Sequence, residues 1–233
     1  MSDQTGSVAG SVDVANLTTL GTATLSDALD RLGLPGSAAG MAPLGPGQRM
    51  AGPAFTVRYV PVGAVHGTVG DYLDDCVAGQ VVVLDNYGRT DCTVWGEILT
   101  LLAHDQGLAG TAINGVCRDV REPLELGYPI YSRGRFMRTG KDRVEVADVN
   151  GRVVLGDVQV NPGDIVVGDD DGVVVIPQGR VDEVAGIATR ISDVEHRIVE
   201  ASRRGQSLAA ARREFGYHQL QREVASSTAS API

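Results

Sequence analysis

Aromatic residues and cysteines are scarce in this chain of 233 residues. Phe, Trp and Tyr together make up 4% of the sequence, so the hydrophobic core must be built mainly from Val, Leu, Ile and Ala. The three cysteines, Cys76, Cys92 and Cys117, lie far apart and form no Cys-x-x-Cys pair, which argues against a zinc site or a disulfide framework. An odd number of cysteines is typical of a reducing compartment, and we therefore expect a cytoplasmic protein.

The chain also lacks long apolar runs and a surplus of basic residues. Its first ten residues contain neither the basic start nor the apolar segment of a signal peptide, and no run approaches the roughly 18 apolar residues of a membrane-spanning helix. The formal net charge of −9 argues against a general nucleic-acid surface, because binding to polyanions requires clustered Lys and Arg. We therefore expect no membrane and no nucleic acid as partner, whereas the charge is compatible with a protein partner or a small anion.

Glycine and short apolar segments are abundant. Residues 81–84 form a continuous apolar run typical of a parallel strand buried on both faces, and a polar turn is expected at 85–89. A helix is expected from Trp95–Gly96 to Gly107, followed by a second strand and helix at 110–126. We expect the first of these helices to bury Ile98, Leu101 and Leu102. This repetition of strand and helix predicts right-handed crossovers and a parallel core.

The segment before this core predicts a helix at 13–32, in which Ser26 and Asp27 cap a second short helix. A loop is expected at 36–52, a half-buried strand at 55–59 and a short helix near 71–75.

The segment after the core predicts an additional antiparallel or mixed sheet region. Short strands are expected at 130–131, 144–146, 153–155, 165–167 and 173–176, with a two-residue hairpin turn at Asn150-Gly151. A long amphipathic helix at 180–204 and a shorter helix at 207–215 follow; the long helix is expected to bury Val184, Ile187, Ile191, Val194 and Ile198. We expect a flexible N-terminus at 1–12, a single domain at 13–215 that ends in the long C-terminal helix, and a tail at 216–233.

The stretch 110–122 carries the chain's main candidate site, because it places Arg118, Asp119 and Glu122 where a buried strand leads into a helix. Two interpretations fit this spacing. Asp119 could accept a backbone N–H at the helix start while Glu122 completes a capping box. Alternatively, both carboxylates face a hard divalent cation and Arg118 binds an anionic substrate. The local sequence does not decide between them.

A second junction of this kind contains Gly96, Glu97, Ile98 and Leu99. Strands of one parallel layer place such junctions side by side, and a helix start can offer free N–H groups to a carboxylate. Gly96 would permit close approach there, although a plain capping or packing glycine explains it equally well. Motifs of phosphate-binding loops, serine hydrolases, zinc proteases and dinucleotide-binding folds are absent from the sequence, and a catalytic Cys–His pair is disfavoured.

Together with Leu126-Gly127-Tyr128-Pro129 and Asn161-Pro-Gly-Asp164, these motifs resemble the RraA-like family, which includes the 4-hydroxy-4-methyl-2-oxoglutarate/4-carboxy-4-hydroxy-2-oxoadipate aldolases. The family fingerprint is a small-residue helix start followed downstream by Arg-Asp-x-x-Glu/Asp, and the resemblance covers roughly residues 25–205. It implies an α/β fold of three layers, like the swivelling phosphohistidine domains. It also implies homotrimers or hexamers with sites between subunits.

The resemblance further implies the roles of individual residues in class II aldolase chemistry. Asp119 would hold Mg²⁺ or Mn²⁺, and Glu122 would order the water shell of the metal. Arg118 would bind the keto and carboxylate oxygens of a 2-keto acid substrate, and the backbone N–H groups of Ile98 and Leu99 would take its carboxylate.

Two further positions follow from the resemblance alone. His66 stands where the family aldolases have an Asn, and this departure bears on the choice of substrate more than on the reaction class. Glu195 is the nearest match to a glutamate that a neighbouring subunit contributes to the family site.

The predicted function is a divalent-metal-dependent pyruvate aldolase that cleaves 4-hydroxy-2-keto acids. Cleavage leaves an enolate that the metal and Arg118 would stabilise, while a metal-ordered water near Glu122 would take the hydroxyl proton. Oxaloacetate gives the same enolate when it loses CO₂, so decarboxylation should accompany the reaction. Two alternatives stay open: a protein that binds and inhibits ribonuclease E without catalysis, although such relatives lack the Asp after the Arg, and an aldolase scaffold adapted to another acid, such as a sugar acid.

Overall fold

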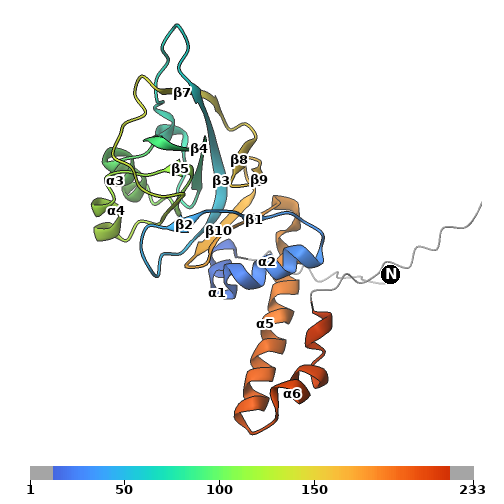
Figure 1. Ribbon diagram of the computed structural model, residues 1–233. Coiled ribbons are helices and arrows are strands. Elements are labelled where there is room, and N and C mark those ends of the chain that lie inside the picture. Colours follow the sequence, from blue (N-terminus) through green and yellow to red (C-terminus); the bar gives the residue numbers. More distant parts are fainter. Residues whose placement is uncertain (1–12, 221–233) are drawn as a thin grey trace, which may run out of the picture.

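The computed structural model describes residues 13–220, apart from the side chain of Gln219 (Figure 1). The flexible N-terminus expected at 1–12 and residues 221–233 of the expected tail lie outside the described residues. The first residues of that expected tail include a short 3-10 helix, η4 (Tyr217–Gln219). Within residues 13–220, no helix is both long enough and apolar enough to cross a membrane.

A nine-stranded mixed sheet forms the body of the molecule. Four neighbouring strands pair in parallel and confirm the predicted parallel core: β3 (Met50–Pro61), β4 (Val81–Thr93), β5 (Gly110–Val116) and β6 (Ile130–Ser132). The other strands add antiparallel pairs: β1 (Ser37–Ala38), β11 (Gly172–Ile176) and β10 (Ile165–Asp169) beyond β3, β2 (Ala42–Pro43) beyond β6, and β7 (Val144–Val149) along the C-terminal half of β3.

The apolar run of β4 explains why this strand lies at the centre of the core. Residues 81–84 are fully buried, and because successive side chains point to opposite faces of a sheet, they enter two different core clusters. Val82 and Leu84 pack on the side of α3 (Glu97–Asp105) and α4 (Arg121–Leu126). The alternate residues pack on the side of a separate hairpin, β8 (Val153–Leu155) and β9 (Val158–Val160) (Figure 1).

Helices α2 (Thr22–Arg31) and α5 (Val181–Arg203) cover the end of the sheet formed by β10 and β11. The expected apolar stripe of α5 is buried at four of its five positions, and Val194 is partly buried. The distal part of α5 extends away from the sheet, where Ile198 packs against α6 (Leu208–Glu214) (Figure 1). A short 3-10 helix, η3 (Gln178–Arg180), precedes α5.

The helix expected at 13–32 is interrupted, and its predicted caps are wrong. It consists of η1 (Val14–Asn16), α1 (Leu17–Leu20) and α2, with the break at Gly21, whose φ is +79°. Ser26 and Asp27 lie inside α2. The start of α2 is instead held by Asp169 of β10, whose carboxylate accepts hydrogen bonds from the backbone N–H and the hydroxyl of Thr22. A residue 147 positions away cannot be found from local spacing.

The predicted buried stripe of α3 is also wrong. Ile98 and Leu102 are 74% and 47% exposed, and Leu101 is partly buried, whereas Thr100 and Ala103 are buried. The indole N–H of Trp95 donates to the hydroxyl of Thr100 at 2.9 Å, so a buried hydrogen bond fixes Thr100 on the inward side of α3, beside Ala103.

Three expectations about strands are corrected by the pairing. β4 continues through 85–93 instead of ending in a turn, because Arg89 and Thr93 pair with β5 after two register shifts. β3 is largely buried on both faces, since it lies inside the sheet. Asn150-Gly151 makes no hairpin, because β7 pairs with β3 and β8 with β9. The strand β9, and β1 and β2 within the expected loop at 36–52, were not predicted.

Candidate active site

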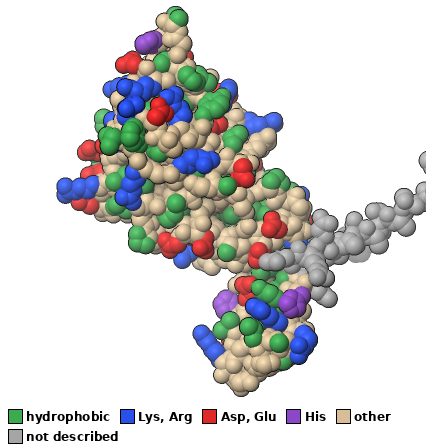
Figure 2. Space-filling model, viewed as in Figure 1, with side chains coloured by type: hydrophobic (Ala, Val, Ile, Leu, Met, Phe, Trp, Pro, Cys, Tyr) green, Lys and Arg blue, Asp and Glu red, His purple; other side chains and the backbone are tan. Residues whose placement is uncertain are grey.

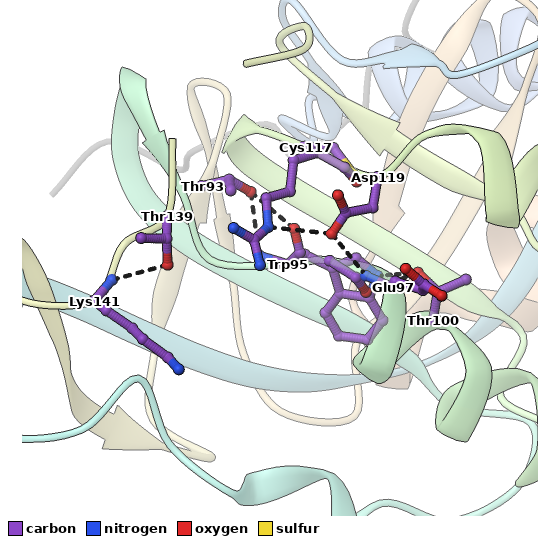
Figure 3. A network of polar contacts seen from close by, with 10 residues as sticks. Thr93, Trp95, Glu97, Thr100, Cys117, Asp119, Thr139 and Lys141 are labelled. Carbon is purple, nitrogen blue, oxygen red and sulfur yellow. Dashed lines mark hydrogen bonds and ion pairs between the residues drawn. The ribbon is translucent and has the colours of Figure 1, made fainter. Parts of the chain in front are cut away.

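A cavity of about 350 Å³ opens where the core strands β4 and β5 end. Four segments line it: 69–71 after β3, 93–99 around the start of α3, 118–119 after β5, and 139–141 before β7. The two loop-to-helix junctions predicted from the sequence therefore lie side by side. Figure 3 shows Asp119 and Glu97 together on one side of the site and Thr139 and Lys141 on the other.

Asp119 connects the two junctions. Its Oδ2 accepts a hydrogen bond from the backbone N–H of Glu97 at 3.1 Å and lies 3.2 Å from Nε of Arg118 (Figure 3). Both charged side chains are 38% exposed. The capping-box interpretation is wrong, because α4 begins after Val120 and no side chain caps it. Asp119, with φ of +54°, instead turns toward the neighbouring helix.

Gly96 leaves room for this arrangement. Its backbone is extended, so a positive φ does not explain the glycine. A Cβ at this position would lie 2.7 Å from Oδ2 of Asp119 and 3.1 Å from Nε of Arg118. Any larger residue would therefore push into the Arg118–Asp119 pair.

The start of α3 offers N–H groups to the cavity. The first one, from Glu97, is taken by Asp119, and Thr100 N–H bonds to the carbonyl of Gly96. Within residues 13–220, the N–H groups of Ile98 and Leu99 have no acceptor, as expected for the first turn of a helix. Both residues line the cavity, so a carboxylate could bind there.

Buried contacts fix the position of this junction. The Trp95 side chain is 1% exposed, and the hydroxyl of Thr93 both donates to the Trp95 carbonyl and accepts from its backbone N–H. Cys117, two residues before Asp119, is fully buried. Burial, and secondarily the charge of Asp119, raises the pKa of the Cys117 thiol to about 12. Cys117 is therefore a neutral packing group at neutral pH, in line with the sequence interpretation that disfavours a catalytic Cys–His pair.

The cavity contains six of the nine predicted site residues: Gly96, Glu97, Ile98, Leu99, Arg118 and Asp119. Glu122 is partly exposed in the first turn of α4 and does not line it. His66 lies on the exposed segment after β3, with Nδ1 3.4 Å from Oδ1 of Asp142. Glu195 lies on α5, which packs at the opposite end of the sheet.

The cavity residues that were missed from the sequence include Asp71, Thr139, Gly140 and Lys141. A signal was present for the last three, because residues 133–143 carry several cations in a chain of net charge −9. Arg89 and Arg138 lower the pKa of Asp91 to about 2, Arg89 chiefly by hydrogen bonding. Basic residues of β4 and of the segment 133–143 therefore lie near the same carboxylate. Figure 2 shows Lys and Arg side chains gathered on the upper part of the sheet body.

Comparison with known proteins identifies the family. A family model described as RraA-like, Aldolase/RraA, matches residues 22–175. The chain belongs to the RraA-like family. Its α/β architecture, with a parallel core inside a mixed sheet, confirms the fold class expected from the resemblance.

Two curated relatives are similar over most of the chain. Protein DlpA of Legionella pneumophila is 38% identical over 200 residues, which cover 84% of this chain and 32% of DlpA. The chain thus spans about a third of the length of DlpA. A protein of Halalkalibacterium halodurans named "Putative 4-hydroxy-4-methyl-2-oxoglutarate aldolase" is 33% identical over 173 residues, which cover 73% of this chain and 79% of that protein.

Two solved structures share the fold. An uncharacterized protein from Pseudomonas syringae pv. tomato has a TM-score of 0.77 at 40% identity, over 86% of this chain and all of the other. RraAS2 of Streptomyces coelicolor, described as an unusual member of the RNase ES inhibitor RraA protein family, has a TM-score of 0.70 at 29% identity. That match covers 83% of this chain and 96% of RraAS2.

Proposed function

We propose that this cavity is the active site of a divalent-metal-dependent pyruvate aldolase that cleaves 4-hydroxy-2-keto acids and also decarboxylates oxaloacetate. The observation that carries the proposal is the Arg118–Asp119 pair held against the free start of α3 in one cavity. The relative named as an aldolase supports the same reaction class.

The anion-binding groups of the site suit the acid end of such a substrate. The N–H groups of Ile98 and Leu99 point out of a helix start, where the helix dipole also favours negative charge. Arg118 uses Nε for Asp119, and its two terminal nitrogens make no hydrogen bond to any residue from 13 to 220. They are available as a two-pronged donor to the keto and carboxylate oxygens.

The metal-ligating side chains of the site suit Mg²⁺ or Mn²⁺ better than Zn²⁺. Among the described residues, no three His, Cys, Asp or Glu side chains come together as a ready metal cluster. Mg²⁺ and Mn²⁺ accept one or two carboxylates and complete their shell with water. Both contacts of Asp119 use Oδ2, so Oδ1 is left to hold such an ion, and Glu122 is proposed to act only through water. When bound, the ion would supply Lewis-acid polarisation of the keto oxygen.

Arg118 would lower the barrier to cleavage by stabilising the negative charge that develops on the substrate. Breaking the bond between C3 and C4 leaves its electron pair on the pyruvate fragment as an enolate. The Arg118 guanidinium is a permanent cation beside the oxygen that gains this charge. The buried residues Val94 and Trp95 add apolar surface to the cavity lining. A less polar surrounding strengthens the attraction between the Arg118 guanidinium and the enolate.

Oligomer formation is part of the proposal. The distal half of α5 extends away from the sheet, so Glu195 of one subunit could reach the cavity of a neighbour in a trimer or hexamer (Figure 1). His66, on the exposed segment after β3, is proposed to influence the choice of substrate. We propose the cytoplasm as the site of action.

A second candidate function is the inhibition of a ribonuclease of the E type. The similarity to RraAS2 favours it, since that protein is described as a member of a ribonuclease-inhibitor family. Ribonuclease inhibition by purified protein, unaffected by substitution of Asp119, together with the absence of pyruvate release, would favour this candidate.

The aldolase proposal is tested with a panel of 4-hydroxy-2-keto acids and oxaloacetate in the presence of Mg²⁺ or Mn²⁺. Arg118→Lys keeps a positive charge but removes the planar fork, and should lower kcat/KM by about 100-fold or more. Arg121→Lys is the matched control, because Arg121 is 86% exposed and pairs with Glu125 outside the cavity. Equal activity of the two variants would contradict the role of Arg118.

A further inference from the structure

Cleavage of a 4-hydroxy-2-keto acid needs a group that takes the proton of the C4 hydroxyl. That group must lie in the cavity, because a general base works within hydrogen-bond reach of its proton. Five charged residues line the cavity: Asp71, Glu97, Arg118, Asp119 and Lys141. Arg118 and Lys141 have no acceptor atoms as cations. A water near Glu122 is a weaker choice, since Glu122 does not line the cavity.

The three carboxylates belong to different walls. Glu97 and Asp119 lie at the two adjoining junctions, linked by the hydrogen bond between them, where the keto-acid end is proposed to bind. Asp71 comes from the segment after β3, outside these two junctions. The C4 hydroxyl lies beyond the keto group in the substrate, so a base from a separate wall suits its position.

The carboxylate of Asp71 is free to act. It is exposed, and it makes no hydrogen bond or ion pair with any residue in the described part of the chain. Although Asp71 stands directly before the 3-10 helix η2 (Tyr72–Asp75), its side chain does not cap that helix. Both of its oxygens are therefore available to a substrate.

The backbone on both sides of Asp71 is fixed. Gly70 has φ of +87°, and a Cβ there would lie 2.6 Å from Cγ2 of Val146, so the chain passes tightly over β7. Tyr72 is 4% exposed, and its hydroxyl lies 3.1 Å from that of Tyr59. These neighbours fix the backbone from which the Asp71 side chain extends, which limits the positions that its carboxylate can take.

The same segment is tied to β7 at two further points. The backbone N–H of Gly67 donates to the carboxylate of Glu145 at 2.5 Å, and the N–H of Val146 donates to the carbonyl of Thr68 at 2.9 Å. The Tyr59 hydroxyl donates to the carbonyl of Val69 at 3.0 Å. The wall that carries Asp71 is thus anchored to the sheet.

We infer that Asp71 is the proton acceptor in aldol cleavage; this role rests on the proposed function. The C4 hydroxyl proton passes to the Asp71 carboxylate as the C3–C4 bond breaks. The oxygen of C4 becomes a carbonyl oxygen, and the electron pair of the broken bond forms the pyruvate enolate. Solvent then protonates C3 to give pyruvate, and Asp71 returns its proton to solvent.

Decarboxylation of oxaloacetate separates this role from the rest of the site. The reaction forms the same enolate and uses the same keto-acid end, but its substrate has no hydroxyl proton to lose. Loss of the base should therefore affect cleavage alone, whereas damage to the anion or metal site should affect both reactions.

The test compares Asp71→Asn with wild type in both reactions. Asn keeps the size and polarity of the side chain but cannot accept the proton. We expect aldol cleavage to fall about 100-fold or more, while decarboxylation stays within about twofold. Asp74→Asn is the matched control, because Asp74 is an exposed residue of the adjoining 3-10 helix η2 and lies outside the cavity.

Three results would overturn the assignment in an active enzyme: full cleavage activity of Asp71→Asn, an equal loss of both reactions, or the selective loss of cleavage in Glu97→Gln instead. If the wild-type protein releases pyruvate from neither substrate, the proposed function fails together with the role of Asp71.

Discussion

The substitution Gly96→Ala tests whether the position of Asp119 matters. The added Cβ would lie 2.7 Å from Oδ2 of Asp119, whereas ordinary contact begins near 3.4 Å, so the carboxylate must move by about 0.7 Å. Its hydrogen bond to the N–H of Glu97 and its contact with Arg118 would both be disturbed. Because a misplacement of about 1 Å can cost about 100-fold in rate, we expect kcat/KM for oxaloacetate to fall by about 10- to 100-fold.

The same substitution should have little effect on stability. The Arg118–Asp119 pair is 38% exposed, and an exposed pair contributes at most about 1 kcal/mol to folding. The free energy of unfolding, measured with urea, should therefore change by less than about 1 kcal/mol. Gly179→Ala is the matched control, since a Cβ at Gly179 would meet no atom within 4 Å. Full activity of Gly96→Ala would refute the reasoning.

Two further predictions concern the core. Gly52→Ala should cost about 3 kcal/mol or more in urea unfolding, because its Cβ would lie 2.1 Å from the carbonyl oxygen of Gly79; Gly63→Ala, in open space, should be nearly neutral. Burial raises the pKa of Cys117 to about 12 from an ordinary 9.0, so the folded state holds this proton more tightly than the unfolded state. The contribution of Cys117 to the free energy of unfolding should be complete below about pH 9 and decline as the pH rises toward 12. Under reducing conditions, the free energy of unfolding of Cys117→Ala should therefore decline less than that of wild type between about pH 8 and 10.5. An equal decline would contradict this.

The meeting of the two junctions could be predicted from the sequence. The apolar runs at 81–84 and 110–113 mark buried parallel strands, and neighbouring parallel strands bring their C-terminal ends together. That rule alone places Arg118 and Asp119 beside residues 96–99, where the structure has them.

Local spacing failed where a distant contact decides the outcome. A capping box was one of the two interpretations of residues three positions apart, but Asp119 instead binds the N–H of Glu97, 22 positions away. The buried hydrogen bond from the Trp95 indole to the Thr100 hydroxyl fixes which side of α3 faces the core. The apolar Ile98 therefore lies on the exposed side of the helix, where it lines the cavity.

Asp71 and Lys141 could not be placed from the sequence for a related reason. Both lie in long connections, Asp71 beside the short helix expected near 71–75, and the paths of these connections depend on contacts with β7 and β4. The bridge between Thr93 and Thr139 and the bond from Val146 to Thr68 bring these connections to the cavity. No local rule specifies either contact.

The most direct measurement is pyruvate release from oxaloacetate by wild-type protein and Asp119→Ala, each with Mg²⁺ or Mn²⁺ and with a chelator. Asp119 is partly exposed, so the variant should stay folded, as its circular dichroism spectrum would verify. The account predicts release by the wild-type protein only when a divalent ion is present, and no release by Asp119→Ala. Release that survives both the chelator and the substitution would contradict it.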